Sequence, residues 1–123
     1  MAPDASPAGF EEHFLRPRGQ GALPDATHAA CVEDPACGDE LTLELRVVDG
    51  LVDLARFRVR GCSGSIAVGS ALATLLPGRA ARADALTREE LAAEIVGMPP
   101  GKQHVLRLAQ RAFEAALQSS SIT

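Results

Sequence analysis

Two runs of alternating apolar and polar residues constrain the fold more than any other feature of this sequence. Leucine or valine occupies every odd position of residues 41–47, and polar residues stand between them. In residues 55–59, Ala, Phe and Val alternate with arginine. Successive side chains of a strand point to opposite faces of its sheet, so this period of two predicts two strands with one buried face each.

The segment between the two runs predicts a hairpin, whose register depends on the loop. A two-residue turn at Asp49-Gly50 pairs odd positions with even ones, which places the two apolar faces on opposite sides of the sheet. A three-residue loop, 48–50, with a bulge at its glycine makes the faces agree and pairs Leu43 with Ala55. We therefore predict the second register, in which Asp53 lies on the buried face or is displaced by the bulge.

Helical patterns follow the strands. Small and apolar residues recur at helical spacing in residues 66–75, and Pro77-Gly78 ends that helix. Thr87 and Glu90 form a capping box at the start of the next helix, which we expect to end at Gly97. A last helix begins after Pro100. We expect it to bury Val105, Leu108, Ala109, Ala112, Phe113 and Ala116.

Less regular segments precede the strands. We expect a short helix at residues 9–15 and a short strand at residues 27–32, with turn residues between them. Strands first and helices afterwards are typical of the α+β class. The prediction is a small antiparallel sheet of about three strands, covered on one face by helices.

Size and composition predict one domain that does not bind nucleic acid. The chain has 123 residues, 46% of them hydrophobic, and can bury a modest core. We expect the domain at residues 9–118, between flexible tails at 1–8 and 119–123. A net charge of −4, no basic cluster and only four aromatic residues, all Phe, argue against a nucleic-acid surface.

The location follows from two further patterns. No run approaches the roughly 20 apolar residues of a membrane span. The first residues also lack the basic and apolar regions of a signal peptide. We therefore expect a cytoplasmic protein without membrane contact.

Candidate metal ligands gather at one edge of the predicted sheet. Cys37 and Asp39 stand in a glycine-containing turn just before the first strand, and Cys62 follows the second strand. The predicted register pairs Asp39 with Val59, so the three side chains share that edge. His104 starts a helix that can fold over it. Two thiolates, a carboxylate and an imidazole suit a tetrahedral zinc site or an iron-sulfur cluster.

Simpler interpretations of these residues stay open. Three cysteines are an odd number in a chain without export signals, which indicates reduced thiols. A packing role suits any one of them. His104, taken alone, is typical of a residue that caps a surface helix, and the spacings fit no zinc-finger pattern.

Four segments of the sequence occur in an order that points to one protein family. They are His13 to Arg18, Pro35-Ala36-Cys37-Gly38-Asp39, Ala55 to Ala67, and Met98 to His104. Together they resemble the IscU/NifU-type iron-sulfur cluster assembly scaffold proteins, and the resemblance covers about residues 10–118. It implies a scaffold or carrier rather than an enzyme, which passes iron or a [2Fe-2S] cluster to acceptor proteins.

The resemblance also implies a ligand set. Such scaffolds hold a [2Fe-2S] cluster, or zinc as an alternative, on three cysteines and an aspartate, with a histidine beside the third cysteine. Carried over, these are Cys37, Asp39, Cys62 and His104. The third cysteine falls on Val105, which cannot be a ligand. Cys31, six residues before Cys37, is a possible substitute thiolate.

Partners are implied in the same way. A cysteine desulfurase supplies sulfur to such scaffolds, and an Hsp70-type chaperone recognises a Leu-Pro-Pro-Val-Lys segment in some of them. That segment matches Pro99, Pro100 and Lys102, although Met98 replaces the leucine and Gly101 replaces the valine. Because Val105 departs from the family pattern, two alternatives stay open: a diverged zinc-binding module, and a sulfur-relay partner of a desulfurase that does not assemble clusters itself.

Overall fold

A computed structural model describes residues 7–35 and 37–119 and has the predicted α+β architecture. The sheet contains β1 (His28–Glu33), β2 (Glu40–Val48) and β3 (Leu51–Arg60), antiparallel and in that order. The helices are α1 (Phe10–Leu15), α2 (Ser63–Leu75), α3 (Arg88–Glu94) and α4 (His104–Gln118). Two short 3-10 helices are η1 (Ala83–Ala85) and η2 (Pro100–Lys102). The predicted tails lie mainly outside the described residues.

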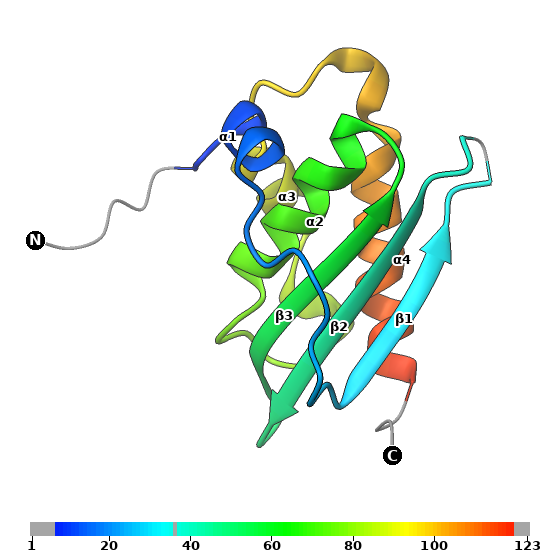
Figure 1. Cartoon of the computed structure of the whole chain (residues 1–123). Helices are drawn as coiled ribbons and strands as arrows, with labels where there is room; N and C mark the ends of the chain where they lie inside the picture. The colour runs from blue at the N-terminus through cyan, green and yellow to red at the C-terminus, as the bar shows by residue number, and fades with distance from the viewer. Residues whose placement is uncertain (1–6, 36, 120–123) are drawn as a thin grey trace, which may run out of the picture.

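The helices cover one face of the sheet. Helix α4 packs against β1 and β2, and α2 packs against β3, while α1 and α3 lie outside these two helices (Figure 1). The other face carries the polar positions of the strands. The segment around Gln20 runs beside β3 and bonds to Phe57 through both of that residue's backbone groups. None of the described helices combines the length and the apolar character needed to cross a membrane.

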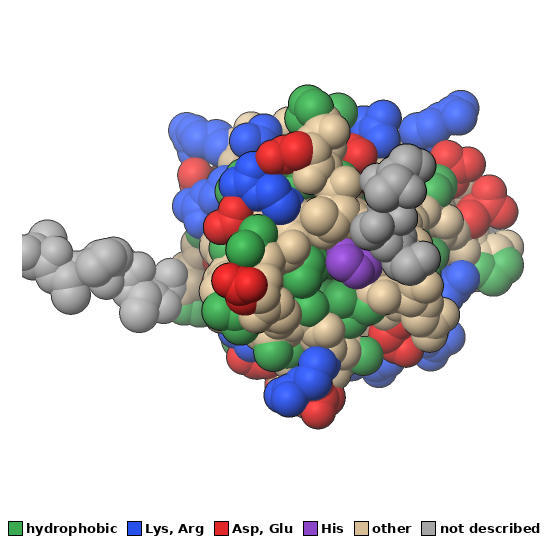
Figure 2. All heavy atoms as spheres, turned by 90° about the horizontal axis from the view of Figure 1, so that it is seen from below, with side chains coloured by type: hydrophobic (Ala, Val, Ile, Leu, Met, Phe, Trp, Pro, Cys, Tyr) green, Lys and Arg blue, Asp and Glu red, His purple; other side chains and the backbone are tan. Residues whose placement is uncertain are grey.

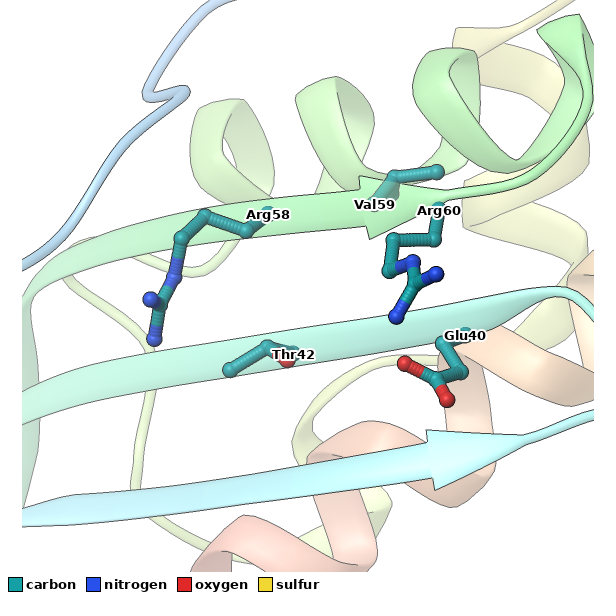
Figure 3. A pocket seen from close by; sticks show the side chains of 5 residues that line it. All are labelled: Glu40, Thr42, Arg58, Val59 and Arg60. Carbon is teal, nitrogen blue, oxygen red and sulfur yellow. The ribbon is translucent and has the colours of Figure 1, made fainter.

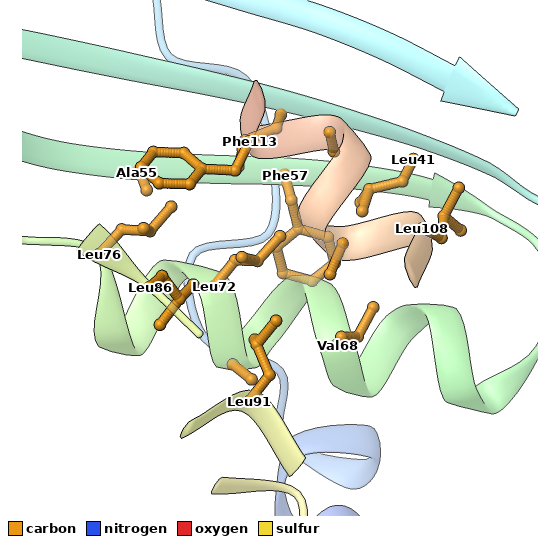
Figure 4. Close-up of a cluster of buried hydrophobic side chains, with 14 of the residues drawn as sticks. Leu41, Ala55, Phe57, Val68, Leu72, Leu76, Leu86, Leu91, Leu108 and Phe113 are labelled. Atoms are coloured by element: carbon orange, nitrogen blue, oxygen red, sulfur yellow. The ribbon is translucent and has the colours of Figure 1, made fainter. Parts of the chain in front are cut away.

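The core lies between the sheet and the helices. Figure 4 shows Phe57 of β3 between Leu72 of α2 and Leu108 of α4, and all three side chains are buried. A side chain at Gly69 would place its Cβ 2.3 Å from the Phe57 ring, so the glycine allows α2 to approach β3 closely. The six residues predicted to be buried in α4 are all buried, which confirms the helical period.

The predicted hairpin register is wrong. The strands are joined by the two-residue turn Asp49-Gly50, with φ values of 53° and 79°, and Leu43 pairs with Phe57 rather than Ala55. The irregularity lies inside the strands, where Asp53 is the extra residue of a bulge. There Arg46 Nε donates to Asp53 Oδ2 at 2.7 Å on the exposed face. The bulge, held by this ion pair, places the apolar residues of β2 and β3 on the same face of the sheet, so a longer loop is not needed.

Helix α1 is fastened to the domain by a buried histidine. His13 is fully buried, with Nδ1 2.6 Å from Ser70 Oγ of α2 and Nε2 2.8 Å from Glu94 Oε2 of α3. Ser70 Oγ also accepts the Arg18 backbone N–H at 2.8 Å. Ser70 Oγ thus contacts both the ring and the Arg18 backbone, and Glu94 contacts the other ring nitrogen. Three helices are thus joined at one side chain.

Helix α3 begins as predicted and ends early. Thr87 Oγ1 accepts the Glu90 backbone N–H at 3.1 Å, and Glu90 Oε1 accepts the Thr87 backbone N–H at 3.0 Å, which is the predicted capping box. The last residue of the helix is Glu94, whereas the prediction has it run to about Val96 and end at Gly97.

Candidate metal centre

The carboxylate of Asp39 lies at the start of α2 and is held there by hydrogen bonds. Its Oδ2 accepts the Ser65 hydroxyl at 2.6 Å and the Cys62 backbone N–H at 3.2 Å. Cys62 is the N-cap residue of α2, and its own side chain caps no backbone amide. The first amides of a helix need acceptors, so a carboxylate from the loop before β2 serves as the cap.

These bonds fix the charge of Asp39. Burial raises the pKa of its carboxyl, but the hydrogen bonds from Ser65 and Cys62 outweigh that effect and lower the pKa to about 2. Asp39 is therefore an anion at neutral pH, although its side chain is buried.

The observed register brings Asp39 closer to Cys62 than the sequence predicted. Glu40 pairs with Arg60, so Asp39 comes level with Gly61 and not with Val59. A side chain at Gly61 would place its Cβ 2.5 Å from Asp39 Cγ. Only glycine leaves room for the carboxylate at this point.

Cys37 lies at the surface in a loop that doubles back. The Asp34 backbone N–H donates to the Asp39 carbonyl oxygen at 2.8 Å, and the Gly38 N–H donates to the Asp34 carbonyl oxygen at 2.7 Å. Gly38 has a φ of 78°, in the left-handed region that favours glycine. The loop thus carries Asp34, Cys37 and Asp39 to the end of the sheet at which α2 starts.

The charges in this loop act on the thiol. The Asp39 backbone N–H lowers the pKa of the Cys37 thiol, but desolvation and the negative charges of Asp39 and Asp34 outweigh it, so the pKa is raised. In the metal-free protein, Cys37 is therefore mainly a neutral thiol at pH 7.

His104 is the first residue of α4 and faces the same edge. Its Nε2 atom is buried and has no hydrogen-bond partner in the described part of the chain. A buried polar atom without a partner costs roughly 1 to 3 kcal/mol, which a bound ligand would offset. The neighbouring Val105 is fully buried, and its Cγ1 lies 3.1 Å from the position a Cβ on Gly64 would take. Val105 therefore packs α4 against the start of α2.

The candidate ligands fall into two groups that share His104. One group is Asp39, Cys62 and His104, and the other is Asp34, Cys37 and His104; within each, the ligand atoms lie within 4.8 Å of one another. Ligand atoms around a tetrahedral zinc ion lie about 3.5 Å apart, so each group closes on an ion with side-chain shifts of about 1 Å. Thiolates, imidazole and carboxylates are also suitable donors for iron.

The structure brings the four residues selected from the sequence to one end of the molecule, the upper end in Figure 1. Asp34 is the additional member that the sequence reasoning missed. A signal was present, because Asp34 stands three residues before Cys37 in the same loop. Cys31 joins neither group: it is exposed on β1, where it pairs with Thr42.

A shallow hollow on the open face of the sheet offers no comparable chemistry. It has a volume of about 250 Å³ and is lined by Glu40, Thr42, Arg58, Val59 and Arg60 (Figure 3). None of these side chains is a thiol or an imidazole, and Arg58 pairs with Glu44 at 3.3 Å.

The end of the molecule seen in Figure 2, opposite the candidate ligands, has acidic and basic side chains spread around an apolar area.

The segment expected to bind a chaperone lies next to the candidate ligands. Pro99 and Pro100 are exposed, and Lys102 is half-buried at the end of η2, two residues before His104. A partner that grips this segment would therefore touch the chain beside the ligands.

Comparisons with known proteins found proteins of similar sequence and similar fold. The family model described as the NifU-like N terminal domain matches residues 10–121. The iron-sulfur cluster assembly scaffold protein IscU 1 of Archaeoglobus fulgidus is 32% identical over 107 residues, which cover 86% of this chain and 70% of that protein. IscU of Aquifex aeolicus is 33% identical over 110 residues, covering 87% of this chain and 70% of that protein. The crystal structure of a hypothetical protein shares the fold, with a TM-score of 0.70 and 23% identity over 89% of this chain and 93% of that one.

Proposed function

The chain belongs to the NifU-like N-terminal domain family, and from that premise we propose that it is an iron-sulfur cluster assembly scaffold. It binds iron or a [2Fe-2S] cluster as cargo and passes it to acceptor proteins. The observation that carries the proposal is the pair of ligand groups that meet at His104. The proposal assigns no catalytic step to the chain.

The proposed ligands are Cys37, Asp39, Cys62 and His104. Two thiolates provide the soft donors that iron-sulfur clusters require, and the carboxylate and imidazole complete the set. Cys37 is exposed, so sulfur and iron donors can reach it. Because Asp39 also caps α2, it fixes the backbone of Cys62 in the metal-free protein as well.

Val105 makes the proposed site less sulfur-rich than that of the scaffolds the chain resembles. We propose that the cargo is therefore held less tightly, and that zinc is an alternative occupant. The donor mixture favours zinc as a second candidate, because carboxylate, imidazole and thiolate all bind Zn²⁺ in tetrahedral sites. If zinc is the occupant, the chain is a zinc-binding module. A separate alternative is a sulfur-relay partner whose exposed Cys37 accepts sulfur from the desulfurase.

The proposed partners follow the same reasoning. A cysteine desulfurase would deliver sulfur at Cys37. An Hsp70-type chaperone would bind the exposed segment that contains Pro99, Pro100 and Lys102, next to His104. Iron-sulfur acceptor proteins would receive the cargo. The cytoplasmic location stays a prediction.

Anaerobic incubation of the metal-free chain with Fe²⁺, cysteine and a cysteine desulfurase tests the function. A scaffold gains visible charge-transfer absorption and then loses it when a cluster-free acceptor is added and becomes active. Zinc that stays bound at one ion per chain, and is not displaced by iron and sulfide, would support the zinc-binding module instead. A sulfur adduct on Cys37 without any cluster would support the sulfur relay.

A further inference from the structure

Asp34 is a buried carboxylate that neither the sequence pattern nor the proposed ligand set includes. It directly follows β1, and only 8% of its surface is exposed. Burial of a carboxylate is costly unless charged or polar groups compensate for it. It lines a hollow of about 180 Å³ together with Pro35 and four residues of α4. These four residues are His104, Arg107, Leu108 and Arg111. The hollow therefore joins this carboxylate to the His104 ring, whose Nε2 has no partner among the described residues.

The distances fit metal coordination. An oxygen of Asp34, the sulfur of Cys37 and a ring nitrogen of His104 lie within 4.8 Å of one another. The three atoms come from two elements, the loop between β1 and β2 and the start of α4. The buried Nε2 of His104 has no partner in the described part of the chain, which is a separate sign that this ring, shared by both ligand groups, is set up to bind a ligand.

The missing thiolate explains why another donor is needed. Val105 packs against the start of α2, and its hydrocarbon side chain has no atom that can bind a metal. Asp39 can contribute only in part, because its Oδ2 is already engaged by Ser65 and Cys62. Asp34 does not have that role at the start of α2, and it carries the same single negative charge as a thiolate.

We propose that Asp34 is a direct ligand of the metal cargo and that, with Cys37 and His104, it compensates for the thiolate that Val105 cannot supply. This inference rests on the proposed function, since it specifies the ligand set of that same site. The charge of a site with three thiolates and one carboxylate is kept, but a hard oxygen donor replaces one soft sulfur. The site therefore tolerates Fe²⁺ and Zn²⁺ well and holds a cluster less firmly.

Titration of the full metal-free chain with Co²⁺ and Zn²⁺ tests this role. Asp34→Asn keeps the shape of the side chain but removes its charge, and we expect its affinity to fall at least tenfold, with a changed cobalt ligand-field spectrum. The matched control is Glu33→Gln, which removes one charge from the exposed neighbouring residue and should change the affinity less than threefold. Circular dichroism confirms that each variant is folded.

A second variant keeps the test decisive if Asp34→Asn is unstable. Asp34→Cys should bind Co²⁺ at least as tightly as the wild type and add cobalt-thiolate charge-transfer absorption. Wild-type affinity in Asp34→Asn, or no added absorption in Asp34→Cys, would overturn the role of Asp34 and leave the scaffold proposal intact. If the wild type binds no Co²⁺, Zn²⁺ or Fe²⁺, both proposals are wrong.

Discussion

Asp39 Oδ2 accepts the backbone N–H of Cys62 at 3.2 Å, so one proposed ligand caps the helix on which the next one stands. The same oxygen accepts the Ser65 hydroxyl. The geometry of the site is therefore coupled to the stability of α2. Substitutions near the ligands can distinguish a loss of folding stability from a loss of metal binding.

Loss of the cap should destabilise the metal-free chain. Asp39→Ala leaves the Cys62 amide and the buried Ser65 hydroxyl without their acceptor, and we expect a loss of about 2 kcal/mol in the free energy of unfolding. Asp39→Asn keeps a carbonyl acceptor and should lose less. Urea denaturation without metal measures both, and equal stability of Asp39→Ala and the wild type would contradict the capping role.

The charge of Asp39 predicts a pH dependence of the metal-free protein. Its pKa is lowered in the folded state from 3.8 to about 2. Its stabilising contribution is therefore fully present above pH 3.8 and is lost as the pH falls towards 2. The unfolding free energy of the wild type should decrease more steeply over this interval than that of Asp39→Asn. Parallel curves for the two proteins would show that Asp39 is not the group responsible.

Gly61 should be needed for the position of Asp39. In Gly61→Ala the new Cβ would lie 2.5 Å from Asp39 Cγ, so the carboxylate or the strand end must move. We expect weaker capping and roughly tenfold weaker zinc binding. Gly101→Ala is the control: it is three residues from His104, and among the described residues no heavy atom beyond its chain neighbours lies within 4 Å of its added Cβ. Similar affinities of the two variants for zinc would argue against this steric account.

His13 should contribute to stability and not to metal binding. It is fully buried and bonds to Ser70 and Glu94, so His13→Ala leaves a cavity and removes one hydrogen bond from each of these two residues. We expect a loss of about 2 to 4 kcal/mol in the free energy of unfolding. His28→Ala, at a less buried histidine, should lose less than about 1 kcal/mol. Thermal unfolding distinguishes them, and a comparable decrease in Tm for both would be the contrary result.

Restoring the third thiol should strengthen cluster retention. In Val105→Cys, a sulfur lies at the start of α4 beside His104, and we expect slower loss of the reconstituted cluster to an iron chelator. Val105→Ser is similar in size but has no thiol, so it controls for changes in packing. Equally fast loss from both variants would show that position 105 does not limit retention.

The sequence predicted those features that depend on neighbouring residues. The face of α4 and the capping box at Thr87 were right because periodicity and caps are set within a few residues. The hairpin register was wrong, because the bulge at Asp53 is held by Arg46, seven residues away on another strand. Asp34 was missed for the same reason. Its proximity to His104 depends on how a loop and a distant helix meet.

The most direct test of the account is anaerobic reconstitution of the wild type and of three variants, in each of which one cysteine is replaced by alanine. Iron, sulfide and visible absorption are measured per chain. The wild type and Cys31→Ala should bind iron and sulfide in equal amounts, because Cys31 lies outside both ligand groups. Cys37→Ala and Cys62→Ala should lose most of the absorption. A colourless wild type, or a loss in Cys31→Ala as large as in Cys62→Ala, would contradict the proposed site.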